Sequence, residues 1–231
     1  MYVSNLVIEI TRRCNANCAH CLRGPAQRMN ISRETITSIF SYVDRIGTLT
    51  LTGGEPSLKP GIIEEITNII RWKHIELGSF YIATNGKSMY RREEFLDACD
   101  TLYMLSYEKE MCTLQVSNDE YHPDFKGYYE EDRPYVKTRL KKHYNIIPEG
   151  RARENGIATG KEQTQPPWIV RDEDEILEPV VYVSCNGNVL SNCDLSYKRI
   201  DSEAIGNINK DSLQTIVERN YVKEEEEAIS N

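Results

Sequence analysis

The sequence predicts an α/β protein, built as a parallel (β/α) barrel with a small C-terminal cap. Two observations lead to this prediction. Between residues 6 and 144, a strand-like run, a loop and a helix-like segment follow one another four times. The residues with unusual chemistry come directly after the strand-like runs. In parallel barrels this position, at the carboxyl ends of the strands, is where active sites form.

Short apolar or β-branched runs define the predicted strands. They are Leu6–Ile10, Thr48–Thr52, Phe80–Ala83 and Thr113–Val116. Helical spacing predicts helices that follow an N-cap at Ser32, begin at Pro60 and cover roughly Tyr90 to Cys99. A basic helix is predicted over Tyr135–Tyr144, as the last helix of the barrel.

The chain divides into three predicted parts: a barrel over residues 1–152, a linker or covering loop over 153–178, and a hairpin with a final helix over 179–231. The hairpin is predicted from Val180–Val183 and Asn188–Leu190, which flank a turn containing Gly187. The final helix begins near Ser212.

Composition limits the class of protein. The 231 residues suffice for one well-buried domain. The 28 basic and 36 acidic side chains give a net charge of -8, which argues against a protein that holds nucleic acid through phosphate contacts. No apolar run is long enough to span a membrane, no signal pattern opens the chain, and the seven cysteines are an odd set. We therefore expect a cytoplasmic protein whose cysteines bind metal or, like Cys99 and Cys112, pack in the core.

Cys14, Cys18 and Cys21 form a C-x3-C-x2-C loop just after the first predicted strand. Three thiolates from one loop can hold three irons of a [4Fe–4S] cluster and leave the fourth iron open to a substrate or cofactor. The alternative is a structural zinc site with His20 as the fourth ligand, although zinc sites usually combine C-x2-C pairs from two loops.

The cysteine loop, the Gly53-Gly54-Glu55-Pro56 sequence after the second strand and the Thr84-Asn85-Gly86 sequence after the third together resemble the radical SAM superfamily. The resemblance implies a partial TIM barrel with a [4Fe–4S] cluster on Cys14, Cys18 and Cys21. It also implies that S-adenosylmethionine (SAM) binds the open iron and is cleaved reductively, so that a hydrogen atom is abstracted from a substrate. A low-potential electron donor, such as flavodoxin or ferredoxin, would be the partner.

The same resemblance implies which residues contact SAM. They are His20, Gly53, Gly54, Glu55, Pro56, Thr84, Asn85, Ser117 and Asp119. The chemistry suits these roles, because glycines let backbone carbonyls approach an ammonium group, Glu55 is an anionic acceptor, and Ser117 and Asp119 suit a ribose diol. Taken singly, Asn-Gly and Ser-x-Asp are also ordinary turn formers.

Tyr121 and His122 follow the fourth strand and are candidates to face the substrate, although a lone histidine more often makes a structural hydrogen bond. A basic cluster is either a solvated helix face or a patch for an acidic peptide or a phosphate group. Its members are Lys137, Arg139, Lys141, Lys142, Arg151 and Arg153.

Cys185 and Cys193, with Ile205-Gly-Asn-Ile208 after them, resemble part of the SPASM or twitch region of peptide-modifying radical SAM enzymes. Those regions hold auxiliary iron–sulfur clusters, whereas two thiolates cannot hold a [4Fe–4S] cluster alone. The pair is therefore an incomplete second metal site or a cluster-free remnant. The segment between Asp119 and Pro148 is shorter than the strand, helix and strand that the superfamily usually has there, so the resemblance also implies an abridged, open barrel of about five strands.

We therefore expect a radical SAM enzyme whose substrate is a peptide, a protein or a small molecule, with the peptide favoured by the resemblance of the C-terminal region. A nucleotide or RNA base is the alternative substrate. The alternative from another class is a non-catalytic iron–sulfur or zinc-binding scaffold, which would have no use for Glu55 beside an open iron.

Overall fold

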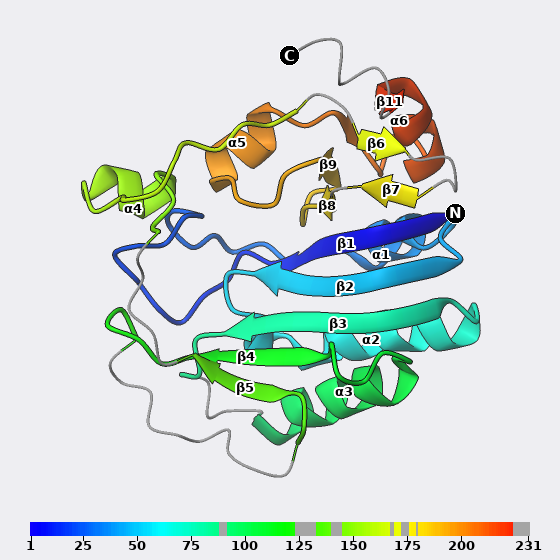
Figure 1. Cartoon of the computed structure of the whole chain (residues 1–231), viewed down its shortest axis with the longest axis horizontal. Helices are drawn as coiled ribbons and strands as arrows, with labels where there is room; N and C mark the ends of the chain where they lie inside the picture. The colour runs from blue at the N-terminus through cyan, green and yellow to red at the C-terminus, as the bar shows by residue number, and fades with distance from the viewer. Residues whose placement is uncertain are drawn as a thin grey trace.

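The computed structural model describes residues 1–87, 92–122, 133–139, 145–166, 169–171, 176–178 and 180–223. Its centre is an open sheet in which six strands run parallel, in the order β8-β1-β2-β3-β4-β5 (Figure 1). These strands are β1 (Tyr2–Thr11), β2 (Arg45–Gly53), β3 (Glu76–Thr84), β4 (Thr113–Ser117), β5 (Val136–Arg139) and β8 (Val181–Val183). The sheet confirms the predicted α/β partial barrel.

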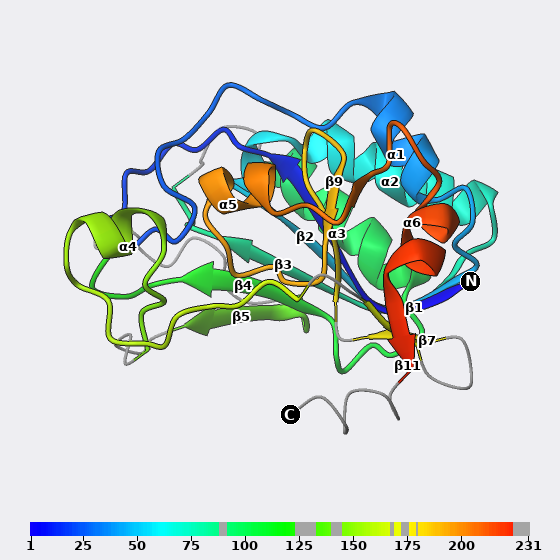
Figure 2. The ribbon, with the colours of Figure 1, turned by 90° about the horizontal axis from the view of Figure 1, so that it is seen from above.

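Three helices cover one face of the sheet (Figure 2): α1 (Arg33–Ile39), α2 (Pro60–Trp72) and α3 (Arg92–Leu105). As predicted, Ser32 is the N-cap of α1, where its side chain accepts a hydrogen bond from the Thr35 N–H, and Pro60 occupies the first turn of α2. Helix α3 extends beyond its predicted end at Cys99, because Leu102 continues the buried face formed by Phe95 and Cys99.

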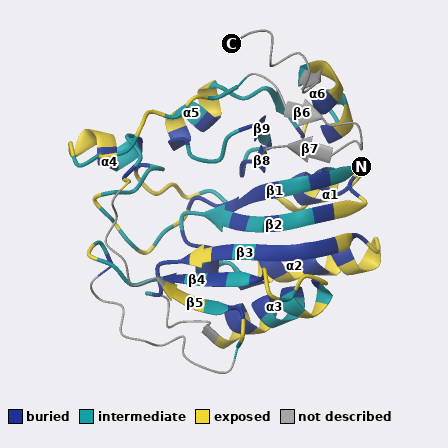
Figure 3. Ribbon diagram, in the orientation of Figure 1, coloured by how far each residue is buried: buried dark blue, intermediate teal, exposed yellow. Residues whose placement is uncertain are grey.

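Strand register decides which side chains face the helices and which face away. Leu6, Leu49 and Phe80 are register partners on β1, β2 and β3, and all three are fully buried in the core under the helices. The adjacent residues in the same register, one step along each strand, point to the opposite face because side chains alternate. Figure 3 shows the result, with buried strands and helices that are exposed on their outer faces.

The prediction of a basic helix over Tyr135–Tyr144 is wrong for the residues that the structure describes. Val136–Arg139 is strand β5, paired in parallel with β4. Tyr135 precedes it and is buried, with its ring 5.5 Å from that of Phe80. This contact across the sheet outweighs the helix-forming residues that follow. Residues 140–144, and with them Lys141 and Lys142 of the basic cluster, lie outside the described residues.

The C-terminal unit, which we define as residues 180–223, extends the sheet beyond β1 rather than capping it from a distance. The predicted hairpin is β8 and the antiparallel β9 (Asn188–Leu190), and β8 pairs in parallel with β1. Its other elements are α5 (Tyr197–Ser202), β10 (Gly206–Asn207), α6 (Leu213–Asn220) and β11 (Tyr221–Lys223). The predicted hairpin and final helix are therefore confirmed.

The segment predicted as a linker or covering loop, 153–178, contains more regular structure than expected. Helix α4 (Gly150–Glu154) crosses its start, and strands β6 (Ile169–Arg171) and β7 (Ile176–Glu178) follow. β7 pairs with the beginning of β1, so this segment also joins the sheet. The division of the chain into domains stays a prediction. Among the described helices, none combines the length and apolar character needed to cross a membrane.

Candidate functional site

The three cysteines of the loop after β1 line one cavity of about 450 Å³. Its floor is the sheet face that points away from the helices, formed by Val7 of β1, Thr50 of β2 and Tyr81 of β3, which are register partners. The cysteine loop and the carboxyl ends of β2, β3 and β4 form the rim. Parallel strands thus bring together four loops that are far apart in the sequence.

Most of the predicted cofactor-binding residues lie at this cavity. The lining includes His20, Gly53, Gly54, Glu55, Pro56, Thr84, Asn85 and Ser117, together with His122, which was predicted to face the substrate. Asp119 and Tyr121 are not part of the lining. The structure therefore brings most of these residues together, whereas their contacts with SAM stay a prediction.

The two glycines of the GGEP sequence pack directly against the chain that leads into the cysteine loop. Gly54 N–H donates to the Thr11 carbonyl at 2.7 Å, and Glu55 N–H donates to the Arg13 carbonyl at 2.8 Å. A Cβ atom at Gly53 would lie 2.0 Å from the Thr11 oxygen, and one at Gly54 would lie 2.3 Å from the Arg13 oxygen. Only glycine fits this close approach of two backbones.

The Glu55 carboxylate connects the ends of β2 and β3. It is 1% exposed and accepts hydrogen bonds from Ser57 N–H at 3.0 Å, the Thr84 hydroxyl at 2.6 Å and Asn85 N–H at 2.8 Å. The Asn85 amide in turn donates to the Asn15 side chain at 2.9 Å and lies 3.7 Å from the Cys14 sulfur. One polar network therefore joins the GGEP and TNG sequences to the first cysteine.

Asp119 and His122 form a second connection, on the other side of the cysteine loop. The Asp119 carboxylate lies 2.7 Å from His122 Nδ1, and His122 Nε2 lies 3.4 Å from the Cys18 sulfur. The ring of Tyr121 lies 4.2 Å from that of His20. In this arrangement Asp119 orients the imidazole toward Cys18, a role that the sequence analysis did not anticipate for it.

The cysteine loop suits a cluster by its donor chemistry. Within the described residues, no group of three or more His, Cys, Asp or Glu side chains is close enough to hold one metal ion. A cubane is larger than one ion, and three thiols that face one cavity are the donor set it needs. Burial raises the pKa of the Cys14 thiol to about 11 and raises that of Cys18, so iron has to displace the protons.

Arg23, Cys193 and Asp194 line the side of the cavity next to β1 and β8. Of these, Arg23 and Asp194 were not predicted as site residues. Cys193 belongs to the pair predicted as a second metal site, but its partner Cys185 has a different environment, where its sulfur donates to the Glu9 carbonyl at 3.1 Å. No local pattern in the sequence marks Arg23 or Asp194.

A buried ionic network anchors the cysteine loop to the C-terminal unit. Arg12 is fully buried, donates to Glu9 at 2.7 Å, and makes two hydrogen bonds of 2.8 Å to Asp201. Glu9 also accepts from the Tyr182 hydroxyl at 2.5 Å and from Cys185 N–H at 3.1 Å. We call these five residues the Arg12 clamp. It fixes the residue that stands two positions before Cys14.

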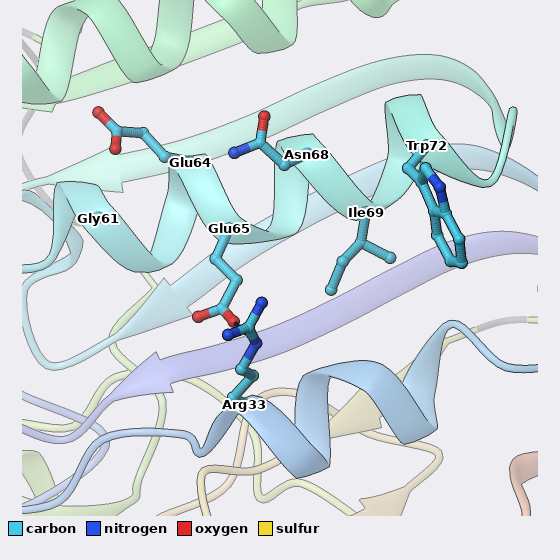
Figure 4. Close-up of a pocket in the computed structure, with 7 residues that line it drawn as sticks. All are labelled: Arg33, Gly61, Glu64, Glu65, Asn68, Ile69 and Trp72. Carbon is cyan, nitrogen blue, oxygen red and sulfur yellow. Dashed lines mark ion pairs between the residues drawn. The ribbon is translucent and has the colours of Figure 1, made fainter.

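A second hollow of about 510 Å³ lies outside the barrel, between α1 and α2 (Figure 4). The Arg33–Glu65 ion pair, with an N–O distance of 2.9 Å, spans it, and the exposed ring of Trp72 stands at one end. Its lining contains none of the predicted site residues. This hollow is therefore separate from the site predicted from the sequence.

Comparisons with known proteins identify the family of this chain. The model of the radical SAM superfamily matches residues 8–145. A probable GTP 3',8-cyclase of Pyrococcus abyssi is 36% identical over 98 residues, or 41% of this chain and 31% of that protein. The putative peptide biosynthesis protein YydG of Bacillus subtilis is 26% identical over 146 residues, or 58% of this chain and 44% of that protein. The chain thus spans less than half the length of these two relatives.

Among solved structures, SuiB of Streptococcus suis bound to its precursor peptide SuiA has the same fold, with a TM-score of 0.55 at 11% identity. The match covers 94% of this chain and 64% of that one. The family match extends over more than half of the sequence, and the fold and the cysteine cavity are of the kind that the family implies. The chain belongs to the radical SAM superfamily.

Proposed function

We propose that this protein is a radical SAM enzyme that acts on a peptide, with a [4Fe–4S] cluster held by Cys14, Cys18 and Cys21. When bound, the cluster supplies the electron for reductive cleavage of SAM. The side chains around it have separable tasks. Glu55, held by Asn85 N–H and the Thr84 hydroxyl, offers its remaining acceptor capacity to the ammonium group of SAM. The Asn85 amide and the His122 imidazole lie next to the Cys14 and Cys18 sulfurs, where they orient the thiolates.

The charge of the cavity lining supports a peptide over a nucleotide. Among the described residues that line the cavity, Arg23 is the one Lys or Arg side chain, and the floor is neutral, with Thr50, Tyr81 and Gln115. A nucleoside triphosphate carries several negative charges, and proteins usually neutralise them with several cationic groups or a bound Mg²⁺. A peptide needs hydrogen-bonding groups and little charge, which this lining offers.

Two of the similar proteins agree with the peptide assignment by their names. SuiB binds a precursor peptide, and YydG is a putative peptide biosynthesis protein. The first likeness is one of fold, and the second covers 58% of this chain. They therefore add to the argument from charge without replacing it.

The test of the radical chemistry is anaerobic reconstitution with iron and sulfide, followed by dithionite and SAM, with 5′-deoxyadenosine measured by chromatography. Wild type should form 5′-deoxyadenosine and contain about four irons per chain. The variant with Cys14, Cys18 and Cys21 all changed to Ala should form none. The control is Cys112→Ala, which removes a buried thiol outside the cavity and should keep its iron. A well-formed cluster without product, or zinc in place of iron, would contradict the proposal.

The second candidate is a nucleotide-modifying enzyme, favoured by GTP 3',8-cyclases that are 31–36% identical to this chain over 36–42% of its length. We expect that millimolar GTP leaves the rate of 5′-deoxyadenosine formation unchanged and is itself recovered intact. Consumption of GTP by the reconstituted protein would replace the peptide assignment by the nucleotide one.

A further inference from the structure

The cavity has two sides that differ in the elements that form them. The motifs expected to bind SAM are at the carboxyl ends of β2, β3 and β4, with Glu55, Asn85 and Ser117. The other side, next to β1 and β8, is formed by residues that the SAM motifs leave unused, and it includes Arg23, Cys193 and Asp194. A substrate has to lie beside SAM, so this β1–β8 side is where its groups would be recognised.

Arg23 is a half-buried cation at this place, with few partners of its own. Its guanidinium donates to the Leu195 carbonyl at 2.7 Å and lies 5.2 Å from the centre of the Tyr182 ring on β8. These contacts place the charged end on the β1–β8 side. Within the described part of the chain, no carboxylate makes an ion pair with it.

Arg12, on the other side of the cysteine loop, provides an internal comparison. Its guanidinium donates to Glu9, to both oxygens of Asp201 and to the Gln27 side chain. The charge of the Glu9 carboxylate favours the charged form of Arg23 through space, but its oxygens accept hydrogen bonds from Arg12, Tyr182 and Cys185 rather than from Arg23. A planar guanidinium binds a carboxylate through two parallel hydrogen bonds, and among the described residues no carboxylate makes this paired contact with Arg23. The cavity therefore offers space for a carboxylate that makes a direct, paired contact with Arg23.

We propose that Arg23 binds a carboxylate of the peptide substrate and so determines which peptides the enzyme accepts. The carboxylate belongs to an Asp or Glu side chain or to the C-terminus of the peptide. Asp194, on the same side of the cavity, repels further negative charge, so the site suits one carboxylate and disfavours a polyphosphate. This inference rests on the proposed function, because it assumes that SAM occupies the other side.

The test uses the reconstituted protein with SAM bound and three fluorescently labelled pentapeptides. One has a central glutamate and an amidated C-terminus, the second has glutamine in its place, and the third is the glutamine peptide with a free C-terminal carboxylate. Fluorescence anisotropy gives the Kd of each. In wild type, one of the two carboxylate peptides should bind about tenfold more tightly than the neutral one, which identifies the source of the carboxylate.

Arg23→Gln should abolish this preference, and Arg23→Lys should keep only part of it because an ammonium cannot form the paired hydrogen bonds. The matched control is Arg13→Gln, an exposed arginine of the same loop, which should keep the full preference. The Kd for SAM, measured by equilibrium dialysis, should change less than about twofold in Arg23→Gln.

Equal binding of the three peptides by wild type, or a preference that survives Arg23→Gln, would overturn the inference. So would a tenfold weaker Kd for SAM in Arg23→Gln with the peptide preference unchanged, since Arg23 would then serve the cofactor. The 5′-deoxyadenosine measurement on wild type is independent of these results. Its failure would count against the proposed function, whereas product formation without a carboxylate preference would count against Arg23 alone.

Discussion

The rim of the cavity and the C-terminal unit are built from contacts of different range. At the rim, Glu55 joins Thr84 and Asn85, which are 29 and 30 residues away, on the next strand of the sheet. In the Arg12 clamp, Arg12 reaches Asp201 over 189 residues, and Tyr182 reaches Glu9 over 173. The rim is formed by neighbouring loops of the sheet, whereas the clamp joins the beginning of the chain to the C-terminal unit.

This difference suggests that the rim residues bind ligands, whereas the residues of the Arg12 clamp support the fold. The rim side chains line the cavity, so replacing them should change the binding of ligands there. The clamp lies behind the cysteine loop, and Arg12 and Glu9 are both fully buried. Its replacement should change the stability of the fold and the position of the loop. Variants on each side can therefore test whether the two regions are as distinct as their contacts suggest.

The largest effect should come from Arg12→Met. This change replaces the unbranched stem of the arginine by one of similar shape, but it removes the guanidinium and leaves Glu9 as a buried carboxylate without its hydrogen-bonded cation. Breaking a buried ion pair by removing one partner costs about 3–5 kcal/mol. We expect a loss of this size in the free energy of unfolding, measured by urea titration. Arg28→Met, at an exposed position after the same loop, should stay within about 0.5 kcal/mol of wild type, and an equally small loss for Arg12→Met would contradict the importance of the clamp.

Gly54→Ala should have the next largest effect, on the rim. The new methyl group would lie 2.3 Å from the Arg13 carbonyl oxygen, and the backbone leading to Cys14 has to shift to relieve the clash. Overpacking of this kind costs about 1–3 kcal/mol. We expect a lower iron content after reconstitution, together with a Kd for SAM that is about tenfold weaker or more.

The matched control for this prediction is Gly61→Ala on helix α2, where a Cβ atom meets nothing within 4 Å. This variant should keep its iron and its SAM affinity, and alanine should slightly stabilise the helix. Normal iron content and SAM affinity in Gly54→Ala would show that the close packing of the two backbones is not needed for the site.

The sequence was sufficient to predict the rim because its residues follow strands. Leu6–Ile10 and Thr48–Thr52 are recognisable as strands, and parallel pairing then places Cys14 and Glu55 at the same edge of the sheet. The β1–β8 side could not be predicted in the same way. Arg23 reaches its position through contacts with Leu195 and Tyr182, and nothing near it in the sequence indicates which distant segment will pack there.

Two other features show why local patterns fail. Residues 136–139 carry helix-forming basic side chains, yet they form β5 because Tyr135 packs against Phe80 and β4 offers free hydrogen-bonding groups. Cys185 and Cys193 are close in sequence and suggested a shared metal site. The first instead donates to the Glu9 carbonyl beside the Arg12 clamp, and the second lines the cavity. In both cases a contact with a residue that is distant in the sequence determines the local structure, and the local sequence pattern does not identify that residue.

The smallest effect should come from Asp201→Asn, which changes the partly exposed end of the Arg12 clamp. The hydrogen bond from Arg12 holds the pKa of the Asp201 carboxyl below its usual value. The side chain is 41% exposed, so solvent screening limits the loss of stability to about 1 kcal/mol near neutral pH. Because the folded pKa is depressed, this contribution is present above the pKa of an unfolded aspartate, about 4, and is lost as the pH falls through the folded pKa.

Urea unfolding of wild type and Asp201→Asn, both without cluster, should therefore show a difference near pH 7 that shrinks as the pH falls below about 4 and disappears once the pH is below the folded pKa of Asp201. A difference that is constant over this pH range would mean that the asparagine side chain destabilises the protein for a reason other than the lost charge, such as its orientation toward Arg12 and Asn186. A loss as large as that of Arg12→Met would make Asp201, and not Glu9, the principal counter-charge of the buried guanidinium. The clamp would then depend chiefly on the C-terminal unit, and the cysteine loop could not be positioned without it.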